Sequence, residues 1–270
     1  MPGRLRITAL DTVLDLEFPA RAPRAFVDAV EHAWSRCLAE GERPPASAEP
    51  LAVNAPETED DEAIRGALQL LSQDVTHHLI AAQSGRLLMF HAGAVSDPAT
   101  GATLVYVAPS GTGKTTLSRL LGRTHSYLTD ETVGIDPASG RIFPYPKPLS
   151  VVHGGRWRKV ETSPDDLGLL PATSEPRVAR IVVLNREAHS RLVGAEERPV
   201  LVEELGTLDA IAALVPETSA LNRLPRPLHA VASLLEHTGP LLRLTYREAA
   251  DLGPVAAKLI EDAARTEDTV

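Results

Sequence analysis

The chain of 270 residues has a hydrophobic content of 43%, a charged content of 23% and a formal net charge of −9. These are ordinary values for a globular protein, and the length allows one large domain or two unequal ones. The negative charge excludes a broadly basic surface, so we expect neither a nucleic acid nor an anionic membrane as a partner. A single cysteine, Cys37, excludes an internal disulfide and a cysteine-based metal cluster.

No apolar run has the length of a membrane span, and the first residues lead into no apolar signal segment. We therefore expect a cytoplasmic protein. Assembly into a homo-oligomer stays open, because neither composition nor charge decides it.

The first 84 residues are predicted to form an α+β region. Residues 5–18 alternate in two stretches, which predicts a β-ribbon with a break near Asp11. Residues 23–39 and 61–84 carry apolar side chains at helical spacing, which predicts two helices. The stretch 40–56 has little periodicity and is predicted as a loop or a short edge strand. We expect the region 1–84 to pack on a second domain, residues 85–270, that carries the catalytic site.

The second domain opens with a predicted hairpin, strands 86–91 and 104–107 joined by a turn at 97–101. The hairpin leads into Ala108-Pro-Ser-Gly-Thr-Gly-Lys-Thr115, and a helix to about residue 121 follows. A strand, a glycine-rich turn and a helix in this order are the context of a phosphate-binding P-loop. Gly111 and Gly113 let the backbone turn so that successive N–H groups point at phosphate oxygens.

Within this motif Lys114 can reach the β- and γ-phosphates, and the Thr115 hydroxyl can ligate Mg²⁺. The helix that begins near Lys114 adds the positive end of its dipole. The one departure from the motif is Ala108, where a glycine is usual. The residues assigned to nucleotide binding are Pro109, Ser110, Gly111, Thr112, Gly113, Lys114, Thr115 and Thr116.

Beyond the motif, a strand is predicted to end at Asp130-Glu131, and Asp130 lies 15 residues after Thr115. In a phosphate-loop fold this position lies beside the γ-phosphate. A carboxylate there can hold the metal or accept a proton from an attacking hydroxyl, and two neighbouring acids could divide these roles. The alternative is a turn-forming acidic pair on the surface.

The rest of the chain is predicted from periodicity and turn residues. A polar loop with short helical pieces is expected over 154–176, and 144–148, with three prolines, cannot be regular structure. The predicted strands are 132–136, 141–143, 178–185 and 241–244. The predicted helices are 203–215, 226–238 and 254–265.

Three further features are candidates for the site. His91 ends the first hairpin strand and lies near the loop if the register allows; otherwise it is a half-buried structural histidine. Lys147 stands in the proline-stiffened segment and could clamp the transferring phosphoryl group, or be a solvated lysine in a connector. Arg156, Arg158 and Lys159 form a basic cluster suited to an anionic substrate, or simply an exposed loop.

Three segments resemble the C-terminal catalytic domain of HPr kinase/phosphorylase. They are His91-Ala-Gly-Ala, Pro109-Ser-Gly-Thr-Gly-Lys-Thr-Thr116 and Leu128-Thr-Asp-Glu131, in the order and at the approximate spacing of that family, over about residues 86–136. The resemblance implies an α/β fold with a twisted mixed sheet that is shared with phosphoenolpyruvate carboxykinase, and a kinase activity with ATP and Mg²⁺.

The resemblance also implies roles for individual residues. Asp130 would be the general base, Lys114 and Thr115 would handle phosphate and Mg²⁺, and His91 would be an active-site residue. Glu131 is then left as a second metal ligand. The family's glycine- and acid-containing signature has no match, and residues 143–149 occupy its region. In this the chain resembles divergent HPr-kinase-like proteins of modified-peptide biosynthesis, including those that phosphorylate lasso peptides.

We interpret the chain as an ATP- and Mg²⁺-dependent kinase that phosphorylates a serine or threonine hydroxyl of a peptide or small protein. The same chemistry on a small-molecule alcohol is an alternative, because loops such as 153–176 would shape the acceptor pocket. A nucleotide-binding regulatory protein with little turnover is an alternative of another class. Ala108 and the missing signature favour it, whereas Asp130, a base candidate, argues against it. No motif in the sequence reads the purine base.

Overall fold

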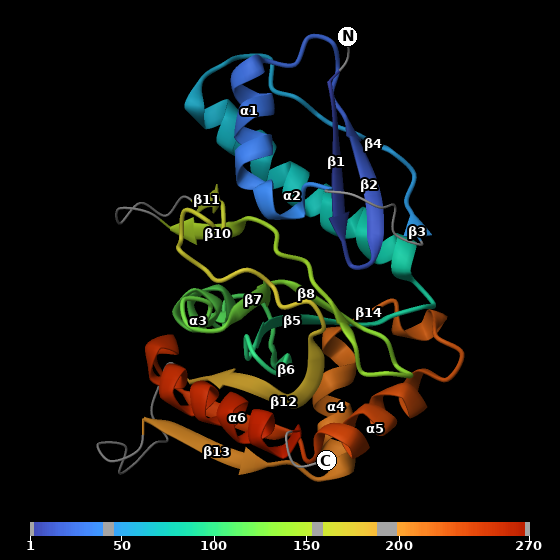
Figure 1. Ribbon diagram of the computed structural model, residues 1–270, viewed down its shortest axis with the longest axis vertical. Coiled ribbons are helices and arrows are strands. Elements are labelled where there is room, and N and C mark those ends of the chain that lie inside the picture. Colours follow the sequence, from blue (N-terminus) through green and yellow to red (C-terminus); the bar gives the residue numbers. More distant parts are fainter. Residues whose placement is uncertain (1–2, 40–45, 153–158, 188–198, 268–270) are drawn as a thin grey trace. The chain divides into compact units, whose positions relative to one another are not determined.

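The computed structural model describes residues 3–39, 46–152, 159–187 and 199–267 (Figure 1). The chain forms two compact units, each built from two segments. The N-terminal unit consists of Met1–Gln83 and Tyr145–Gly168, and the sheet unit consists of Ser84–Pro144 and Leu169–Val270. The sequence predicts a single boundary after residue 84, whereas the structure also assigns Tyr145–Gly168 to the N-terminal unit.

The N-terminal unit combines two helices with short strands. Its elements are β1 (Arg4–Ala9), β2 (Thr12–Glu17), α1 (Arg24–Ala33), a 3₁₀ turn (Ser35–Cys37), β3 (Ala46–Ser47), β4 (Leu51–Ala52), α2 (Asp61–Gln83), β10 (Leu149–Val152) and β11 (Lys159–Thr162). The predicted ribbon is confirmed: β1 and β2 pair antiparallel, and Leu10 and Asp11 turn the chain with φ values of 48° and 55°. Two positive φ angles in succession are typical of the tight hairpin turn that matches strand twist.

Buried polar contacts explain why residues 145–168 belong to this unit. Tyr145 is fully buried in the N-terminal core, and its hydroxyl lies 2.8 Å from the Thr76 hydroxyl of α2. Glu161 of β11 is also buried and accepts a hydrogen bond from Ser72 of α2 at 3.2 Å. Within the predicted loop 154–176, residues 159–162 instead form β11, which pairs antiparallel with β10 and contacts α2 through Glu161.

The sheet unit contains most of the regular structure. Its elements are β5 (Leu88–Ser96), β6 (Ala102–Val107), α3 (Lys114–Leu121), β7 (Ser126–Thr129), β8 (Thr132–Ile135), β9 (Ile142–Phe143), β12 (Arg177–Arg186), β13 (Val200–Glu204), α4 (Thr207–Leu214), a 3₁₀ turn (Val215–Glu217), β14 (Thr218–Ser219), a 3₁₀ turn (Leu221–Arg223), α5 (Pro227–Thr238), β15 (Leu242–Tyr246), a 3₁₀ turn (Ala249–Asp251) and α6 (Leu252–Glu267).

In the described part of the chain these strands form a nine-stranded sheet, and the sheet is mixed, as predicted. Its order is β13-β15-β12-β6-β5-β8-β9, and β7 and β14 each pair with β5. The neighbours β6, β12 and β15 run parallel, whereas the β5–β6 hairpin and the pairs at either end of the sheet are antiparallel. The fold is therefore of the mixed α/β class.

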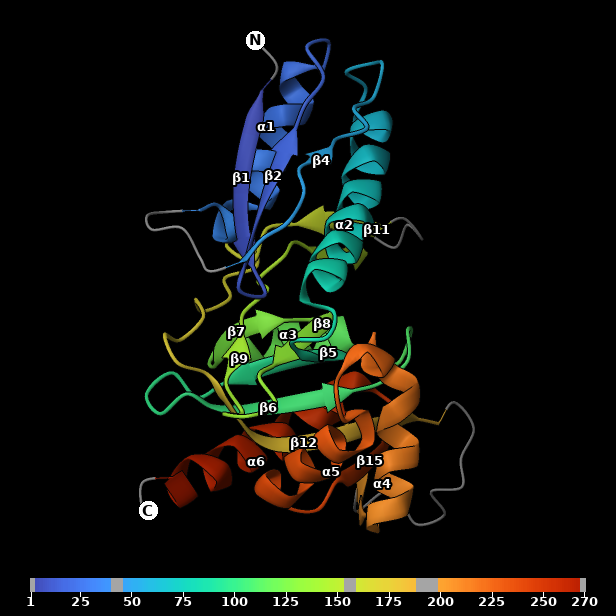
Figure 2. The ribbon, with the colours of Figure 1, turned by 90° about the vertical axis from the view of Figure 1, so that its right-hand side faces the viewer.

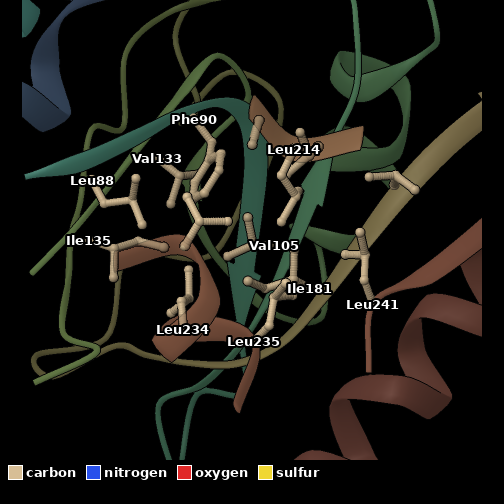
Figure 3. Close-up of a cluster of buried hydrophobic side chains, with 14 of the residues drawn as sticks. Leu88, Phe90, Val105, Val133, Ile135, Ile181, Leu214, Leu234, Leu235 and Leu241 are labelled. Carbon is tan, nitrogen blue, oxygen red and sulfur yellow. The ribbon is translucent and has the colours of Figure 1, made fainter. Parts of the chain in front are cut away.

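Helices cover both faces of this sheet (Figures 1 and 2). Along β6, Val105 and Val107 belong to one core with α4 and α5, and the alternating Leu104 and Tyr106 belong to a second core with α3 and α6. This period of two is the strand pattern that separates the faces of a sheet. Figure 3 shows part of the first core, in which side chains of β5, β6, β8 and β12 meet Leu214 of α4 and Leu234 and Leu235 of α5.

One predicted helix begins later than expected. The sequence predicts a helix over 203–215, but residues 200–204 form β13, and α4 begins at Thr207. Most of β13 is exposed, and the strand exists because it pairs antiparallel with β15 at the end of the sheet. Pairing with a distant strand has here overridden a local preference.

Gly93 of β5 offers a test of the central packing. A Cβ atom at this position would lie 2.1 Å from Cε2 of Tyr106, whose ring is fully buried. Because the ring cannot move into solvent, we expect Gly93→Ala to lower the free energy of unfolding by about 1–3 kcal/mol, the usual range for overpacking. Gly66, inside α2 with nothing within 4 Å of an added Cβ, is the matched control.

Gly66→Ala should raise the stability by about 0.5–1 kcal/mol, because alanine is the better helix former. Urea denaturation followed by circular dichroism measures both variants. A Gly93→Ala protein as stable as the wild type would contradict this account of the sheet core.

Candidate functional site

Strand β5 organises the site, because four other strands pair with it. Its C-terminal half pairs with β6 and β7, and its N-terminal half pairs with β8 and β14. The two halves meet at His91 and Ala92. The glycine-rich loop follows β6, the pair Asp130-Glu131 links β7 to β8, and Glu217 directly precedes β14. The strand register thus brings four distant parts of the chain to one place.

The loop between β6 and α3 has a backbone that requires glycine at two points. Gly111 and Gly113 have φ values of 83° and 106°, in the left-handed region that side chains disfavour. Gly113 also directly precedes the first residue of α3, and a Cβ there would lie 3.0 Å from Cβ of Ala249. The sequence prediction of a strand, a glycine-rich turn and a helix is confirmed.

The loop is braced by its own side chains and by the C-terminal part of the unit. The Thr112 hydroxyl donates to the carbonyl of Pro109 at 2.8 Å, and the buried Tyr246 hydroxyl of β15 donates to the carbonyl of Thr112. Pro109, Ser110 and Gly111 are exposed. Hydrogen bonds from Thr112 and Tyr246 therefore fix the backbone of the turn, while residues 109–111 remain open to solvent.

Lys114, the first residue of α3, is only 6% exposed. Its ammonium group donates to the carbonyl oxygens of Ala108 at 2.5 Å and Pro109 at 3.1 Å. Burial lowers its pKa to about 8, and the nearby carboxylates of Glu217, Asp130 and Glu131 oppose this shift, with Glu217 the strongest of the three.

Asp130 is hydrogen-bonded to Thr115, the residue that follows Lys114. Its Oδ2 accepts a hydrogen bond from the Thr115 hydroxyl at 2.7 Å, and its Oδ1 accepts one from the Tyr127 hydroxyl at 3.2 Å. Asp130 is only 5% exposed, so it is not the surface turn that was the alternative interpretation. A hydroxyl and a carboxylate therefore meet at the N-terminus of α3.

Glu131 is anchored through its backbone. Its carbonyl accepts from the N–H of Ala92 at 3.0 Å, and its own N–H donates to the Thr129 hydroxyl at 3.2 Å. These bonds fix the link between β7 and β8 against β5. The Glu131 carboxylate is near enough to Lys114 to favour its charged form.

His91 lies at the branch point of the sheet, and its carbonyl accepts from the N–H of Ala108 at 3.4 Å. Its Nδ1 is 3.2 Å from Oε2 of Glu217, and the side chains are 34% and 18% exposed. The sequence pattern does not identify Glu217 as a site residue. The only local signal is an acid before a short Thr-Ser segment, which does not distinguish it from other surface acids.

The oxygen atoms at the N-terminus of α3 suit a divalent cation of the Mg²⁺ type. Thr115 and Asp130 offer a hydroxyl and a carboxylate oxygen 2.7 Å apart. In the described part of the chain, no group of three or more His, Cys, Asp or Glu side chains could hold a metal ion by itself. Mg²⁺ fits such a sparse set, since it is usually bound by one or two protein oxygens together with substrate phosphates and water.

The remaining predicted site residues belong to the N-terminal unit. Lys147 is 2% exposed, and its ammonium group donates to the carbonyl of Pro148 at 2.8 Å, so it is not the solvated lysine of the alternative interpretation. Lys159 is exposed at the start of β11. Arg156 and Arg158 lie outside the described residues. The clamp and substrate roles of these four residues stay predictions.

Comparison with known proteins gives distant structural similarity and no match at the level of sequence families. No protein-family model matches the chain, and no curated protein matches it. Among solved structures, the HPr(Ser) kinase/phosphatase from Coxiella burnetii is similar at 14% identity and a TM-score of 0.33, over 67% of this chain and 93% of that one. A TM-score this low does not support an assignment of fold or function. Among the described residues, no helix combines the length and the apolar composition needed to cross a membrane.

The pKa of Lys114 predicts how phosphate binding depends on pH. If the loop binds a nucleotide, the ammonium form of Lys114 is the form that attracts the phosphates. Its pKa of about 8 means that this form is present below pH 8 and is lost as the pH rises further. The association constant of a nucleotide should therefore be flat below about pH 7.5 and fall by up to about tenfold per pH unit above pH 8.

Isothermal titration calorimetry between pH 6.5 and 9.5 measures this dependence. Lys114→Arg is the matched variant, because a guanidinium stays charged over the whole range. The nucleotide affinity of Lys114→Arg should not fall above pH 8, whether it is higher or lower than that of the wild type. The same slope in both proteins would assign the pH dependence to another group.

Proposed function

We propose that the sheet unit is an ATP- and Mg²⁺-dependent kinase that phosphorylates a serine or threonine hydroxyl of a peptide or small protein. The observation that carries the proposal is the 2.7 Å hydrogen bond between Thr115 and Asp130 at the end of a glycine-rich loop. It joins the hydroxyl expected to bind Mg²⁺ to the carboxylate expected to act on the acceptor.

The loop would bind the phosphates of the nucleotide. The left-handed angles at Gly111 and Gly113 support this role, because alternating backbone conformations turn successive N–H groups to one side as an anion nest. The N-terminus of α3 favours negative charge, and Lys114 adds a cation there. In this proposal residues 109–116 are the P-loop.

Mg²⁺ would be held by Thr115, with Asp130 and Glu131 as the nearby acids. When bound, it neutralises charge on the β- and γ-phosphates. The charges of this site make that neutralisation important: three carboxylates oppose one lysine, giving a formal charge of −2 with neutral His91. A triphosphate without a divalent cation would be repelled by this charge.

The reaction itself would use Asp130 as the proton acceptor. The acceptor oxygen forms a bond to the γ-phosphorus while its O–H bond breaks, and the proton passes to the carboxylate of Asp130. The bond between the γ-phosphorus and the bridging oxygen breaks, and ADP leaves. Lys114 would hold the phosphates in place, and His91 would contact the reacting groups.

The proposal is tested by phosphoryl transfer from ATP labelled at the γ-position to serine- and threonine-containing peptides, with alanine-substituted peptides as blanks. Lys114→Ala should abolish transfer and weaken nucleotide binding, because it removes the cation of the loop. Asp130→Asn should keep most nucleotide binding but lower the transfer rate by about 100-fold or more, the usual effect of losing a general base. Lys258→Ala, at an exposed site on α6, is the control and should behave like the wild type.

Near-normal transfer by a folded Lys114→Ala protein would reject the phosphate-binding role of the loop. Nucleotide binding without transfer to any serine, threonine or small alcohol would favour the regulatory interpretation instead.

Substitutions of the two neighbouring acids, Asp130 and Glu131, should differ in how the transfer rate depends on the Mg²⁺ concentration. Glu131→Gln removes a charge near Lys114 but leaves the backbone bonds of Glu131 in place. If Glu131 helps to hold the metal, the variant should need about tenfold more Mg²⁺ for half-maximal transfer, the lower end of the effect of losing a ligand contact. The rate at saturating Mg²⁺ should largely recover.

Asp130→Asn is the comparison for this experiment, since added Mg²⁺ should not restore a missing base. Transfer rates are measured across a magnesium titration at fixed ATP. Superimposable magnesium profiles for the wild type and Glu131→Gln would disprove this division of roles.

A further inference from the structure

Glu217 is a carboxylate of the site to which the reaction described above assigns no role. It ends the 3₁₀ turn Val215–Glu217, far along the chain from the loop, the histidine and the acidic pair. Its side chain is 18% exposed, and it contacts His91. Glu217 is partly buried and acts on two catalytic candidates, His91 and Lys114. Burial of a charge is unfavourable unless the charge has partners, so these interactions are the reason to look for a role.

Strand pairing places Glu217 next to His91. Thr218 and Ser219 of β14 pair antiparallel with Phe90 and Met89 of β5. In an antiparallel register the residue before Thr218 comes opposite the residue after Phe90, which is His91. The contact between Glu217 and His91 therefore follows from the backbone register.

We propose that Glu217 is a positioning residue of the phosphoryl-transfer site, which holds the Nδ1 edge of the His91 ring so that Nε2 is left for the reacting groups. The inference rests on the proposed kinase function. The geometry that supports it is the distance of 3.2 Å between Nδ1 of His91 and Oε2 of Glu217. An ionised carboxylate can only accept, so Nδ1 carries the proton in this pair.

The proton on Nδ1 has a chemical consequence for His91. In a neutral imidazole one nitrogen donates and the other accepts, so a proton held on Nδ1 leaves the lone pair on Nε2. A carboxylate that fixes the tautomer and the orientation of a histidine is a common device of active sites and metal sites. The His91 side chain is 34% exposed and therefore stays accessible to a substrate. It is more accessible than Asp130, which is 5% exposed.

The charge of Glu217 also acts on Lys114. Of the three carboxylates that favour the ammonium form of this buried lysine, Glu217 has the largest influence. The same carboxylate thus accepts a hydrogen bond from one candidate and stabilises the charge of another. A purely structural role for Glu217 would need neither of these interactions.

The hold on His91 can be tested without any catalytic assay. Nitrogen-15 NMR of the full chain labelled on histidine reports the tautomer of each ring, and the His91 signals are assigned by their loss in His91→Gln. We expect an Nδ1-protonated ring in the wild type and in Glu217→Gln, whose amide oxygen can still accept. Glu217→Ala should shift His91 toward the Nε2-protonated form. Glu236→Ala, at an exposed position of α5, is the matched control and should leave the spectrum unchanged.

The catalytic consequence is tested with the same variants. Glu217→Ala should lower kcat by about 10- to 100-fold, the usual effect of losing a positioning partner. The nucleotide affinity at pH 7 should change by less than about threefold, since the contact orients a group and does not bind the phosphates. Glu217→Gln should recover part of the rate. In a His91→Ala background, Glu217→Ala should lower kcat much less than in the wild type, because only its influence on the charge of Lys114 is then lost.

An unchanged His91 tautomer in Glu217→Ala would overturn the inference, and so would an unchanged kcat. Losses of rate that multiply in the double variant would overturn it too, because Glu217 would then act independently of His91. If the wild type transfers no phosphate to any acceptor, the kinase proposal fails, and the NMR experiment still decides whether Glu217 holds His91.

Discussion

The arrangement of the candidate site depends on the pairing of a single strand. The C-terminal half of β5 pairs with β6 and β7, and its N-terminal half pairs with β8 and β14. Each of these partners carries a site residue at the end nearest to His91. A shift of β5 by one residue would turn every side chain of the strand to the opposite face and would separate the histidine from Glu217. Positions such as Gly93, where Tyr106 fills the space of a side chain, oppose such a shift.

Charge balance is the second constraint on the site. The loop places Lys114 where burial disfavours its charge, and three carboxylates compensate for that burial. The same three carboxylates make the site negative, which is unfavourable for a triphosphate and favourable for a divalent cation. A site of this composition should therefore bind its nucleotide together with a metal. The partly buried Thr115–Asp130 contact lies at the point where the metal and the phosphates would meet.

Features that depend on neighbouring residues could be predicted from the sequence. The hairpin before the loop, the glycine-rich turn and α3 are each specified within a few residues, and all three are present. The twisted mixed sheet was expected from the family resemblance of segments within residues 86–136, and a mixed sheet is present. The position of Asp130 beside Thr115 also follows from a short segment, because β7 comes directly after α3 and returns to the sheet.

Features that depend on distant pairing could not be predicted. The strand β14 has two residues, which are too few to show a period, and its partner β5 lies more than a hundred residues earlier. Tyr145 and Glu161 are a similar case, because their burial against α2 becomes evident only when the two segments of the N-terminal unit are seen together. A local pattern records which face of an element is apolar, but it does not record which element covers that face. For this reason a carboxylate such as Glu217 can be recognised as part of the site only after the strand register is known.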